Sequence, residues 1–168
     1  MRLHLKKIDT TNWQDAIRLK VRADQQNFVS PNATSLAKGY IQPYGPDSKF
    51  TPLGIYDGTK MVGYVMLVCD VATKDDYWID DIMIDQQYQG RGYGRAAMAE
   101  VIRYFLTNFS GCRAICLTFH RDNRVAESLY RKMGFENSGR IHKENGEPIY
   151  QLAGAALESF LAESKRAG

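Results

Sequence analysis

The chain has 168 residues, of which 44% are hydrophobic and 24% are charged, and these values exclude a wholly disordered protein. Its length suits a single domain with a sizeable core. The 22 Lys and Arg residues barely exceed the 19 Asp and Glu residues, so charge alone indicates no nucleic-acid partner.

The first third of the chain combines one clear strand pattern with long irregular stretches. Residues 2–8 alternate between apolar and polar side chains and predict a strand. Thr11–Gln14 fits the capping box Thr-x-x-Gln and predicts the start of a helix. Val29–Pro52 carries several Pro and Gly residues, so we expect mostly a loop there, with one short helix near Leu36.

Three apolar runs follow one another in the middle of the chain. Pro52–Tyr56 and Met61–Cys69 flank the turn signal Asp57-Gly58, and Tyr77–Ile84 follows after a polar connection. We therefore expect an antiparallel meander over residues 52–84.

The second half alternates helical and extended patterns. Apolar spacing predicts a helix over 94–109, a strand over 114–119, a helix over 123–133 that ends at Gly134, and a hairpin over 141–152 around Asn145-Gly146. Residues 1–152 are expected to form the domain, and the tail 153–168 is compatible with a short helix. This order predicts an α+β fold with a mixed sheet and a parallel crossover between 77–84 and 114–119.

The cysteines and the hydropathy of the chain indicate in which cellular compartment the protein is expected. The three cysteines are an odd number, which argues against a closed disulfide framework, and Cys112 and Cys116 lack a second pair at zinc-site spacing. We predict no metal site. The longest nearly apolar run, Met61–Cys69, is far shorter than the ~20 residues that span a bilayer. We therefore expect a cytoplasmic protein with no membrane partner.

The most informative segment is the glycine-rich turn after the strand 77–84. Gly90, Gly92 and Gly94 stand at alternate positions, and a helix is predicted to begin at once. Backbone N–H groups at a helix N-terminus form an anion site, and glycines let a phosphate approach closely. Arg91 and Arg95 add positive charge, so the pattern indicates phosphate binding. The Walker motif is absent, and Arg95 breaks the dinucleotide fingerprint Gly-x-Gly-x-x-Gly.

Two blocks of sequence carry a resemblance to a known family. Gln89-x-x-Gly92-x-Gly94 resembles the Gln/Arg-x-x-Gly-x-Gly/Ala motif of the GNAT superfamily of N-acetyltransferases. The block from Asn123 to Phe135 resembles that family's Asn-x-x-Ala-x-x-x-Tyr-x-Lys-x-Gly-Phe helix. The resemblance covers residues 2–152. It implies a single GNAT-like domain whose mostly antiparallel sheet is splayed at the site of acetyl-CoA and flanked by helices.

The resemblance also assigns residues to the co-substrate, acetyl-CoA. It implies that the backbone of the strand residues pairs with the pantetheine arm and that the amides of the turn hold the pyrophosphate. In the later helix, it implies that Asn123 contacts the arm of the co-substrate and that Lys132 contacts phosphate. These residues are Ile82, Met83 and Ile84 on the strand, Gln89, Gly90, Arg91, Gly92, Tyr93, Gly94 and Arg95 in the turn, and Asn123 and Lys132 with the helix. A solvated helix face is the alternative for Lys132 and for Arg131.

Acetyl transfer to an amine poses two proton problems. An amine with the pKa of lysine, ~10.4, is neutral in only about one molecule in a few thousand at pH 7, so a base must remove its proton. Asp80 is the predicted base because polyamine-acetylating relatives carry an acidic residue there. Asp81 is the alternative, since neighbours on a strand point to opposite faces. A structural ion pair is the alternative role for either.

The leaving thiolate needs a proton, and Tyr130 is the predicted general acid. Its alternative role is that of a packed helix tyrosine. A mechanism with a cysteine nucleophile is disfavoured because Cys116 lies in the middle of a predicted strand, with no Cys-His-Asp grouping nearby in the sequence.

The segments 77–85 and 139–150 resemble bacterial spermine/spermidine acetyltransferases, although Asp81 stands where those enzymes carry Arg. A polyamine groove should be acidic, because desolvated ammonium groups need carboxylate partners. We expect Asp81, Trp78 and Asp75 to bind the amine. The wider acidic set is Asp24, Asp70, Asp75, Asp76, Asp80 and Asp81.

Other functions stay open on the sequence alone. The acceptor could instead be a protein N-terminus, an amino acid or an aminoglycoside, or the chain could bind acetyl-CoA without catalysis. A homodimer also remains open.

Overall fold

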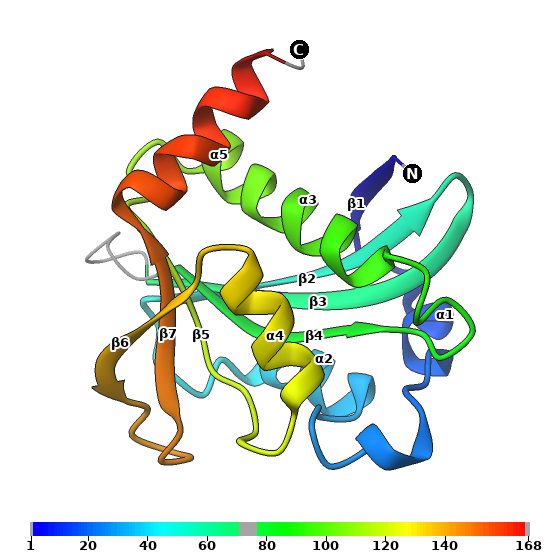
Figure 1. Ribbon diagram of the computed structural model, residues 1–168. Helices are drawn as coiled ribbons and strands as arrows, with labels where there is room; N and C mark the ends of the chain where they lie inside the picture. The colour runs from blue at the N-terminus through cyan, green and yellow to red at the C-terminus, as the bar shows by residue number, and fades with distance from the viewer. Residues whose placement is uncertain (1, 71–76, 167–168) are drawn as a thin grey trace.

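The computed structural model describes residues 2–70 and 77–166, and it shows one seven-stranded sheet with helices on both faces (Figure 1). The strand order is β1-β2-β3-β4-β5-β7-β6. The strands are β1 (Leu3–Lys7), β2 (Ser48–Asp57), β3 (Lys60–Asp70), β4 (Tyr77–Ile84), β5 (Ala114–Leu117), β6 (Glu136–Ile141) and β7 (Pro148–Ala153). The predicted α+β class and the meander β2-β3-β4 are confirmed.

The parallel pair β4–β5 is where the sheet splays. Its described register consists of Tyr77 with Ile115 and Trp78 with Cys116, whereas β4 continues to Ile84. The remaining pairs in the sheet are antiparallel. The second half of β4 therefore keeps a backbone edge that no described strand of the sheet occupies, as the splayed sheet predicted from the sequence requires.

The helices divide between the two faces of the sheet. They are α1 (Trp13–Arg18), α2 (Asn32–Ile41), α3 (Tyr93–Asn108), α4 (Arg124–Lys132) and α5 (Gly154–Arg166), with a 3-10 turn η1 (Ala23–Gln25). In Figure 1, α3 and α5 lie above the sheet and α1 and α2 below it. Helix α4 stands beside the splay, and its Tyr130 and its C-cap residue Met133 belong to the core under α3.

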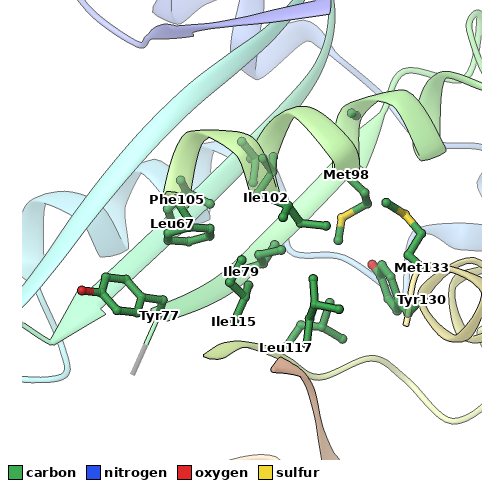
Figure 2. Close-up of a cluster of buried hydrophobic side chains, with 14 of the residues drawn as sticks. Leu67, Tyr77, Ile79, Met98, Ile102, Phe105, Ile115, Leu117, Tyr130 and Met133 are labelled. Carbon is green, nitrogen blue, oxygen red and sulfur yellow. The ribbon is translucent and has the colours of Figure 1, made fainter. Parts of the chain in front are cut away.

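The larger core lies between the sheet and α3. Figure 2 shows Ile102 and Phe105 of α3 against Leu67 of β3 and Ile79 of β4, and all four side chains are almost fully buried. Removal of apolar surface from water stabilises a fold by ~25 cal/mol per Å², so burial of this layer favours folding. A smaller core, which includes Tyr64 and Met83, packs under α1 and α2 on the opposite face.

The predicted capping box is wrong. Helix α1 begins at Trp13, its N-cap is Asn12, and no side chain caps it. The Thr11 hydroxyl instead donates to Asp9 Oδ1 at 2.6 Å, and Asn12 Oδ1 accepts from the Asp9 amide. The Thr11 side chain, which the pattern assigned to the helix start, is thus used within the preceding turn.

Helix α2 is longer than the short helix predicted near Leu36, and it runs over ten residues. Gly39 permits this packing, because a Cβ there would lie 3.2 Å from the Met66 side chain of β3. The strand β2 likewise begins at Ser48, earlier than expected.

The hairpin and the tail are also longer than predicted. The Asn145-Gly146 turn is confirmed, with Gly146 at φ 69°, but the first strand of the hairpin begins at Glu136. The tail forms the 13-residue helix α5, which packs on α3 and buries Leu157. Within the described ranges, no helix combines the length and apolar character needed to cross a membrane.

Candidate active site

The first of two adjoining cavities follows the free edge of β4. It has a volume of about 460 Å³ and lies between β4, the glycine turn, α4 and the segment 21–29. The predicted strand residues Ile82, Met83 and Ile84 all line it. The Ile84 carbonyl already accepts a hydrogen bond from Gln89 Nε2 at 2.9 Å. Successive strand residues direct their backbone groups to opposite edges, and the Asp85 amide donates to the Val62 carbonyl of β3, so the backbone of Met83 also faces β3. The backbone of Ile82 is therefore the better candidate for pairing with an extended ligand, as in strand addition.

The glycine turn has the geometry of an anion cradle. Gly90 has φ 76° and Gly92 has φ 83°, which is the left-handed region that L side chains avoid. Gly92 is the N-cap of α3, and no side chain caps that helix end. The first amides of α3 therefore lack a capping partner, and Arg91 and Arg95 lie exposed beside them. This turn fits the diphosphate of acetyl-CoA.

Two side chains of the turn have structural roles. Gln89 Nε2 donates to Gln25 Oε1 at 2.8 Å and so ties the turn to η1 across the mouth of the cavity. The Tyr93 hydroxyl donates to Asp57 Oδ2 at 2.6 Å, which anchors the start of α3 to the end of β2. Their backbone amides remain the groups that the sequence assigned to pyrophosphate.

Asp85 is a residue that the sequence analysis missed. Its carboxylate is buried and accepts from the amides of Lys20 at 2.9 Å and Gln87 at 3.0 Å. The Gln86 amide adds a bond to the Lys20 carbonyl at 2.7 Å. These contacts fasten the segment after α1 to the end of β4, so Asp85 holds one wall of the first cavity. The only signal was an acidic residue directly after an apolar strand.

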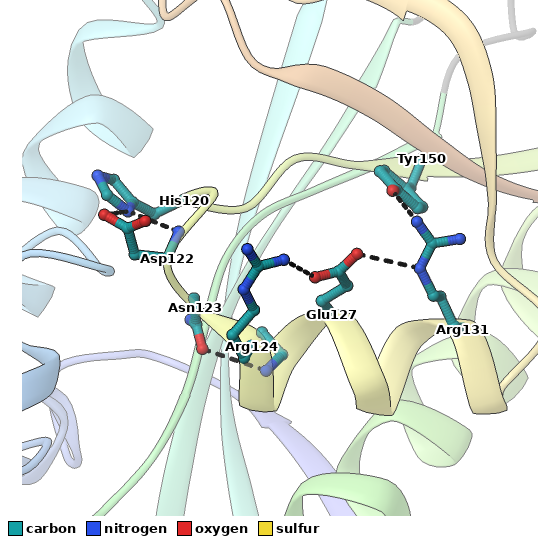
Figure 3. Close-up of polar contacts among 8 residues, drawn as sticks. His120, Asp122, Asn123, Arg124, Glu127, Arg131 and Tyr150 are labelled. Carbon is teal, nitrogen blue, oxygen red and sulfur yellow. Dashed lines mark hydrogen bonds and ion pairs between the residues drawn. The ribbon is translucent and has the colours of Figure 1, made fainter.

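Helix α4 supplies the opposite wall (Figure 3). Asn123 is its N-cap, and its Oδ1 accepts from the Ala126 amide at 3.1 Å while the residue lines the cavity. Arg131 does not face the cavity: it donates to Glu127 at 3.2 Å and to the Tyr150 hydroxyl at 2.6 Å. Lys132 lies exposed in the last turn, outside the residues that line the cavity.

Tyr130 lies at the inner end of α4 and lines the first cavity. Its ring packs between Phe119 at 5.5 Å and Phe135 at 5.9 Å. Burial raises the pKa of Tyr130 to about 12. The phenol therefore keeps its proton at neutral pH and is available as a hydrogen-bond donor.

The second cavity continues from the first past Phe28 and Val29, which line both. It has a volume of about 370 Å³ and lies between α2, β4, the end of β5 and the β6–β7 hairpin. Four carboxylate side chains line it: Asp80, Asp81, Glu144 and Glu147. Lys38 is the one lysine or arginine among the described residues of its lining.

The expectation that Asp80 and Asp81 point to opposite faces is wrong. Ile79 pairs with Leu67 and Asp81 pairs with Met66, so Asp80 is the extra residue of a β-bulge. The bulge resets the alternation, and both carboxylates face α2.

The two aspartates have different surroundings. Asp80 accepts from Lys38 Nζ at 3.3 Å and from the Tyr44 hydroxyl at 3.2 Å. Asp81 interacts with the Ser35 hydroxyl, and its Oδ2 is buried without a hydrogen-bond partner among the residues that the structure describes. Burial, with a smaller contribution from Asp80, raises the pKa of Asp81. Asp80 is therefore the more accessible carboxylate and Asp81 the more enclosed one.

The other residues predicted to bind the amine do not all lie in the second cavity. Trp78 lines the second cavity and stacks edge-on with His142 at 5.7 Å. Asp75 lies outside the described residues. Asp24 is exposed in η1 and pairs with Arg22. The sequence analysis missed Glu144 and Glu147, which the hairpin brings to the cavity; the predicted turn at Asn145-Gly146 was the available signal.

A third hollow of about 410 Å³ extends the second cavity between β4 and β6. It shares side chains such as Trp78 and Asp80 with the second cavity. It adds apolar side chains such as Val68 and Ile149, and the cationic Arg140 and Lys143. The acidic cavity and this hollow together make an elongated cleft. Its inner end opens toward Tyr130 and the glycine turn through the shared residue Phe28.

Known proteins resemble the chain over most of its length. A spermine/spermidine N(1)-acetyltransferase of Bacillus subtilis is 25% identical over 154 residues, which are 89% of this chain and 97% of that protein. A spermidine N-acetyltransferase of Vibrio cholerae, solved with CoA and spermine, has a TM-score of 0.63 at 16% identity, covering 89% of this chain and 93% of that one.

The aminoglycoside acetyltransferase AAC(6')-Ib, solved with coenzyme A, has a TM-score of 0.72 at 15% identity and covers 94% of this chain and 98% of that one. At these identities the solved structures support the fold. The sequence profile of the acetyltransferase (GNAT) family matches residues 15–135, more than half of the chain. The chain therefore belongs to the acetyltransferase (GNAT) family, and the predicted enzyme class, an acetyl-CoA-dependent N-acetyltransferase, is confirmed.

Proposed function

We propose that the protein transfers the acetyl group of acetyl-CoA to a primary amine of a polyamine such as spermidine or spermine. The observation that carries this proposal is the acidic cavity, in which four carboxylates adjoin the groove that ends at Tyr130. Such a cavity attracts a polycation and supplies carboxylate partners for its desolvated ammonium groups. The name of the Bacillus subtilis relative supports the same acceptor class.

The cleft also suits the methylene segments of a polyamine. Trp78 and Tyr44 line both the acidic cavity and the apolar hollow beyond it. Aromatic faces accommodate alkyl chains and attract cations. A linear acceptor can therefore place its ammonium groups among the carboxylates of the acidic cavity and its methylene segments along Trp78 and Tyr44.

The donor side is assigned to the first cavity. Acetyl-CoA supplies a thioester, whose acetyl carbon is open to attack by a neutral amine. The amides at the start of α3, with Gly90 and Gly92, hold its diphosphate, while Arg91 and Arg95 neutralise its charge. The backbone of Ile82 holds the extended arm, Met83 lines the same cavity, and Asn123 borders the arm from α4. Lys132 faces solvent and is left out of this set.

Asp80 is the proposed base for the incoming ammonium. Its carboxylate lines both the acidic cavity and the adjoining hollow, whereas Asp81 Oδ2 has almost no exposed surface. A base must lie within hydrogen-bond reach of the proton or within reach through one water molecule. Asp80 borders the open space of the cavity, so an amine or a water molecule can reach its carboxylate. Asp81 adds negative charge beside it.

Tyr130 is proposed to stabilise the leaving sulfur. Its pKa of about 12 lies above that of an ordinary thiol, so complete proton transfer from Tyr130 to such a thiolate would be unfavourable. Donation of a hydrogen bond avoids this cost and still favours the developing negative charge. We therefore assign Tyr130 the role of donor to the thiolate during its departure.

A second acceptor class, the aminoglycosides, has one observation in its favour. The acidic cavity and the adjoining hollow offer about 370 Å³ and 410 Å³, which is room for a multiply charged acceptor bulkier than a linear polyamine. Both classes carry several ammonium groups, so the carboxylates serve either.

Release of free thiol from acetyl-CoA distinguishes these acceptors. The panel contains spermidine, spermine, an aminoglycoside, free lysine and peptides with a free N-terminus. We expect the highest kcat/KM with a polyamine. A higher value with the aminoglycoside or a peptide would replace the polyamine as acceptor, and binding of acetyl-CoA without release on any amine would indicate a non-catalytic protein.

A further inference from the structure

Lys38 lies inside the acidic cavity and occupies the carboxylate that the acceptor needs. Its Nζ is 3.3 Å from Asp80 Oδ2, and it supplies the single Lys or Arg charge among the described residues that line the cavity. Its ammonium is the same chemical group that a primary amine brings to the site at neutral pH. The Lys38 ammonium therefore occupies the position beside Asp80 that the reacting ammonium of the acceptor would need.

Helix α2 places this lysine by its backbone geometry. Ser35 and Lys38 are three residues apart and therefore share one face of the helix. Ser35 contacts Asp81 and also pairs with the Tyr64 hydroxyl at 3.2 Å, while Lys38 contacts Asp80. Each of the two neighbouring carboxylates on the bulge of β4 therefore contacts its own polar side chain on α2. The four-carbon stem of Lys38 has rotatable bonds, so its ammonium can leave Asp80 without a shift of the α2 backbone.

The ion pair is partly shielded from water. The Asp80 side chain is 14% exposed and that of Lys38 is 32% exposed, so solvent screens this pair less than a pair on the open surface. Tyr44 donates to the other oxygen of the same carboxylate at 3.2 Å. Both oxygens of Asp80 are therefore engaged before any amine arrives, and an incoming ammonium must displace Lys38 or share the carboxylate with it.

We propose that Lys38 is a resident cation that competes with the reacting ammonium of the acceptor for Asp80 and so discriminates against amines with a single charge. A polyamine has further ammonium groups that can bind Glu144 and Glu147 elsewhere in the cleft. A monoamine has no such compensation. The inference rests on the proposed function, because it takes Asp80 as the point where the acceptor amine binds.

The test compares Lys38→Gln, which removes the charge, with Lys38→Arg, which keeps it. Lys6→Gln on β1, at the edge of the sheet beyond β2, is the matched control on an exposed lysine outside the cavity. We expect Lys38→Gln to lower the KM for propylamine about fivefold, the KM for spermidine less than that, and kcat by less than twofold. Lys38→Arg and Lys6→Gln should match the wild type. An unchanged or raised KM for propylamine in Lys38→Gln would overturn the proposal.

A calorimetric titration separates this inference from the proposed function. Amines are titrated into the CoA-loaded protein, which requires no turnover. If the wild type acetylates no amine, the proposed function fails, but tighter propylamine binding by Lys38→Gln still supports the role of Lys38 and equal binding refutes it. Absence of amine binding to the wild type would refute both. Thermal melting checks that each variant folds, and Lys38→Met replaces Lys38→Gln if the latter does not.

Discussion

Two adjacent aspartates serve one cavity in different ways because a single extra residue bends β4. Asp80 is engaged by Lys38 and Tyr44 yet borders open space, whereas Asp81 is enclosed under Ser35. Burial separates their chemistry as well, since it raises the pKa of Asp81. Substitutions at these positions should therefore differ in kind: Asp80 affects turnover, and Asp81 affects stability.

The pKa of Asp81 gives a prediction with a defined sign. Its folded-state pKa lies above that of an unfolded-chain aspartate, ~3.9, so the folded state binds the proton more tightly. Stability is therefore lost as the pH rises through the raised pKa, and Asp81→Asn removes that loss. We expect Asp81→Asn to raise Tm by ~2–4 °C at pH 7, with a smaller gain at pH 4. Asp47→Asn, an exposed control, should shift Tm at neither pH; a lower Tm for Asp81→Asn at pH 7 would contradict the account.

The role assigned to Tyr130 separates catalysis from binding. Tyr130→Phe keeps the ring that packs on Phe119 and Phe135 and removes the hydroxyl. A lost hydrogen bond to a charged group corresponds to a fall in kcat of about 10- to 100-fold. We expect that fall in steady-state assays, with an unchanged dissociation constant for CoA. Tyr104→Phe on α3 is the control, and wild-type turnover by Tyr130→Phe would remove the hydroxyl from the mechanism.

At the scale of single elements, the start of α3 requires a backbone conformation that favours glycine. Gly92 adopts φ 83°, where an alanine costs ~1–2 kcal/mol, and a Cβ there would meet no protein atom within 4 Å, so it would take up open space beside the amides proposed to hold the diphosphate. We expect Gly92→Ala to raise the KM for acetyl-CoA at least about tenfold. Gly58→Ala, at φ 57° in the β2–β3 turn, carries similar strain away from the site and should leave that KM unchanged. Equal KM values in the two variants would argue against the cradle.

Some elements were predictable because their signals are local. The apolar strands around Leu67 and Ile79, the broad apolar face of α3 and the Asn123 cap of α4 all depend on neighbouring residues in the sequence. Helix α2 was underestimated because Gly39 weakens its helical pattern, although contact with Met66 requires a small residue there.

Other features of the site arise only from pairing at long range. The bulge at Asp80 depends on how β4 aligns with Met66 and Leu67, and the sequence of β4 alone cannot reveal it. The placement of Glu144 and Glu147 in the acidic cavity depends on the strand order β5-β7-β6, although the hairpin turn itself was predictable. The sequence pointed instead to the acidic residues of the connection between β3 and β4 as amine-binding groups, because they adjoin β4 in the sequence.

At the scale of the whole molecule, α5 extends the domain beyond the hairpin. Leu157 is 3% exposed, and its helix packs on α3 and β7. Truncation of a buried leucine typically costs ~2–4 kcal/mol, so Leu157→Ala should lower the free energy of unfolding by about that amount in a urea titration. Glu158→Ala, on the exposed side of the same helix, should change it by less than ~0.5 kcal/mol. If both variants unfold like the wild type, α5 contributes no stability.

The assembled molecule places a groove for a thioester beside a cleft lined by four carboxylates. A monoamine brings a single ammonium group to that cleft, whereas each further ammonium group of a polyamine gains a carboxylate partner. Comparison of kcat/KM for spermidine and propylamine, in a thiol-release assay with saturating acetyl-CoA, tests this most directly. The account predicts a preference for spermidine of at least about 100-fold, which shrinks as salt is added. Equal values for the two amines, or a preference that salt does not alter, would contradict it.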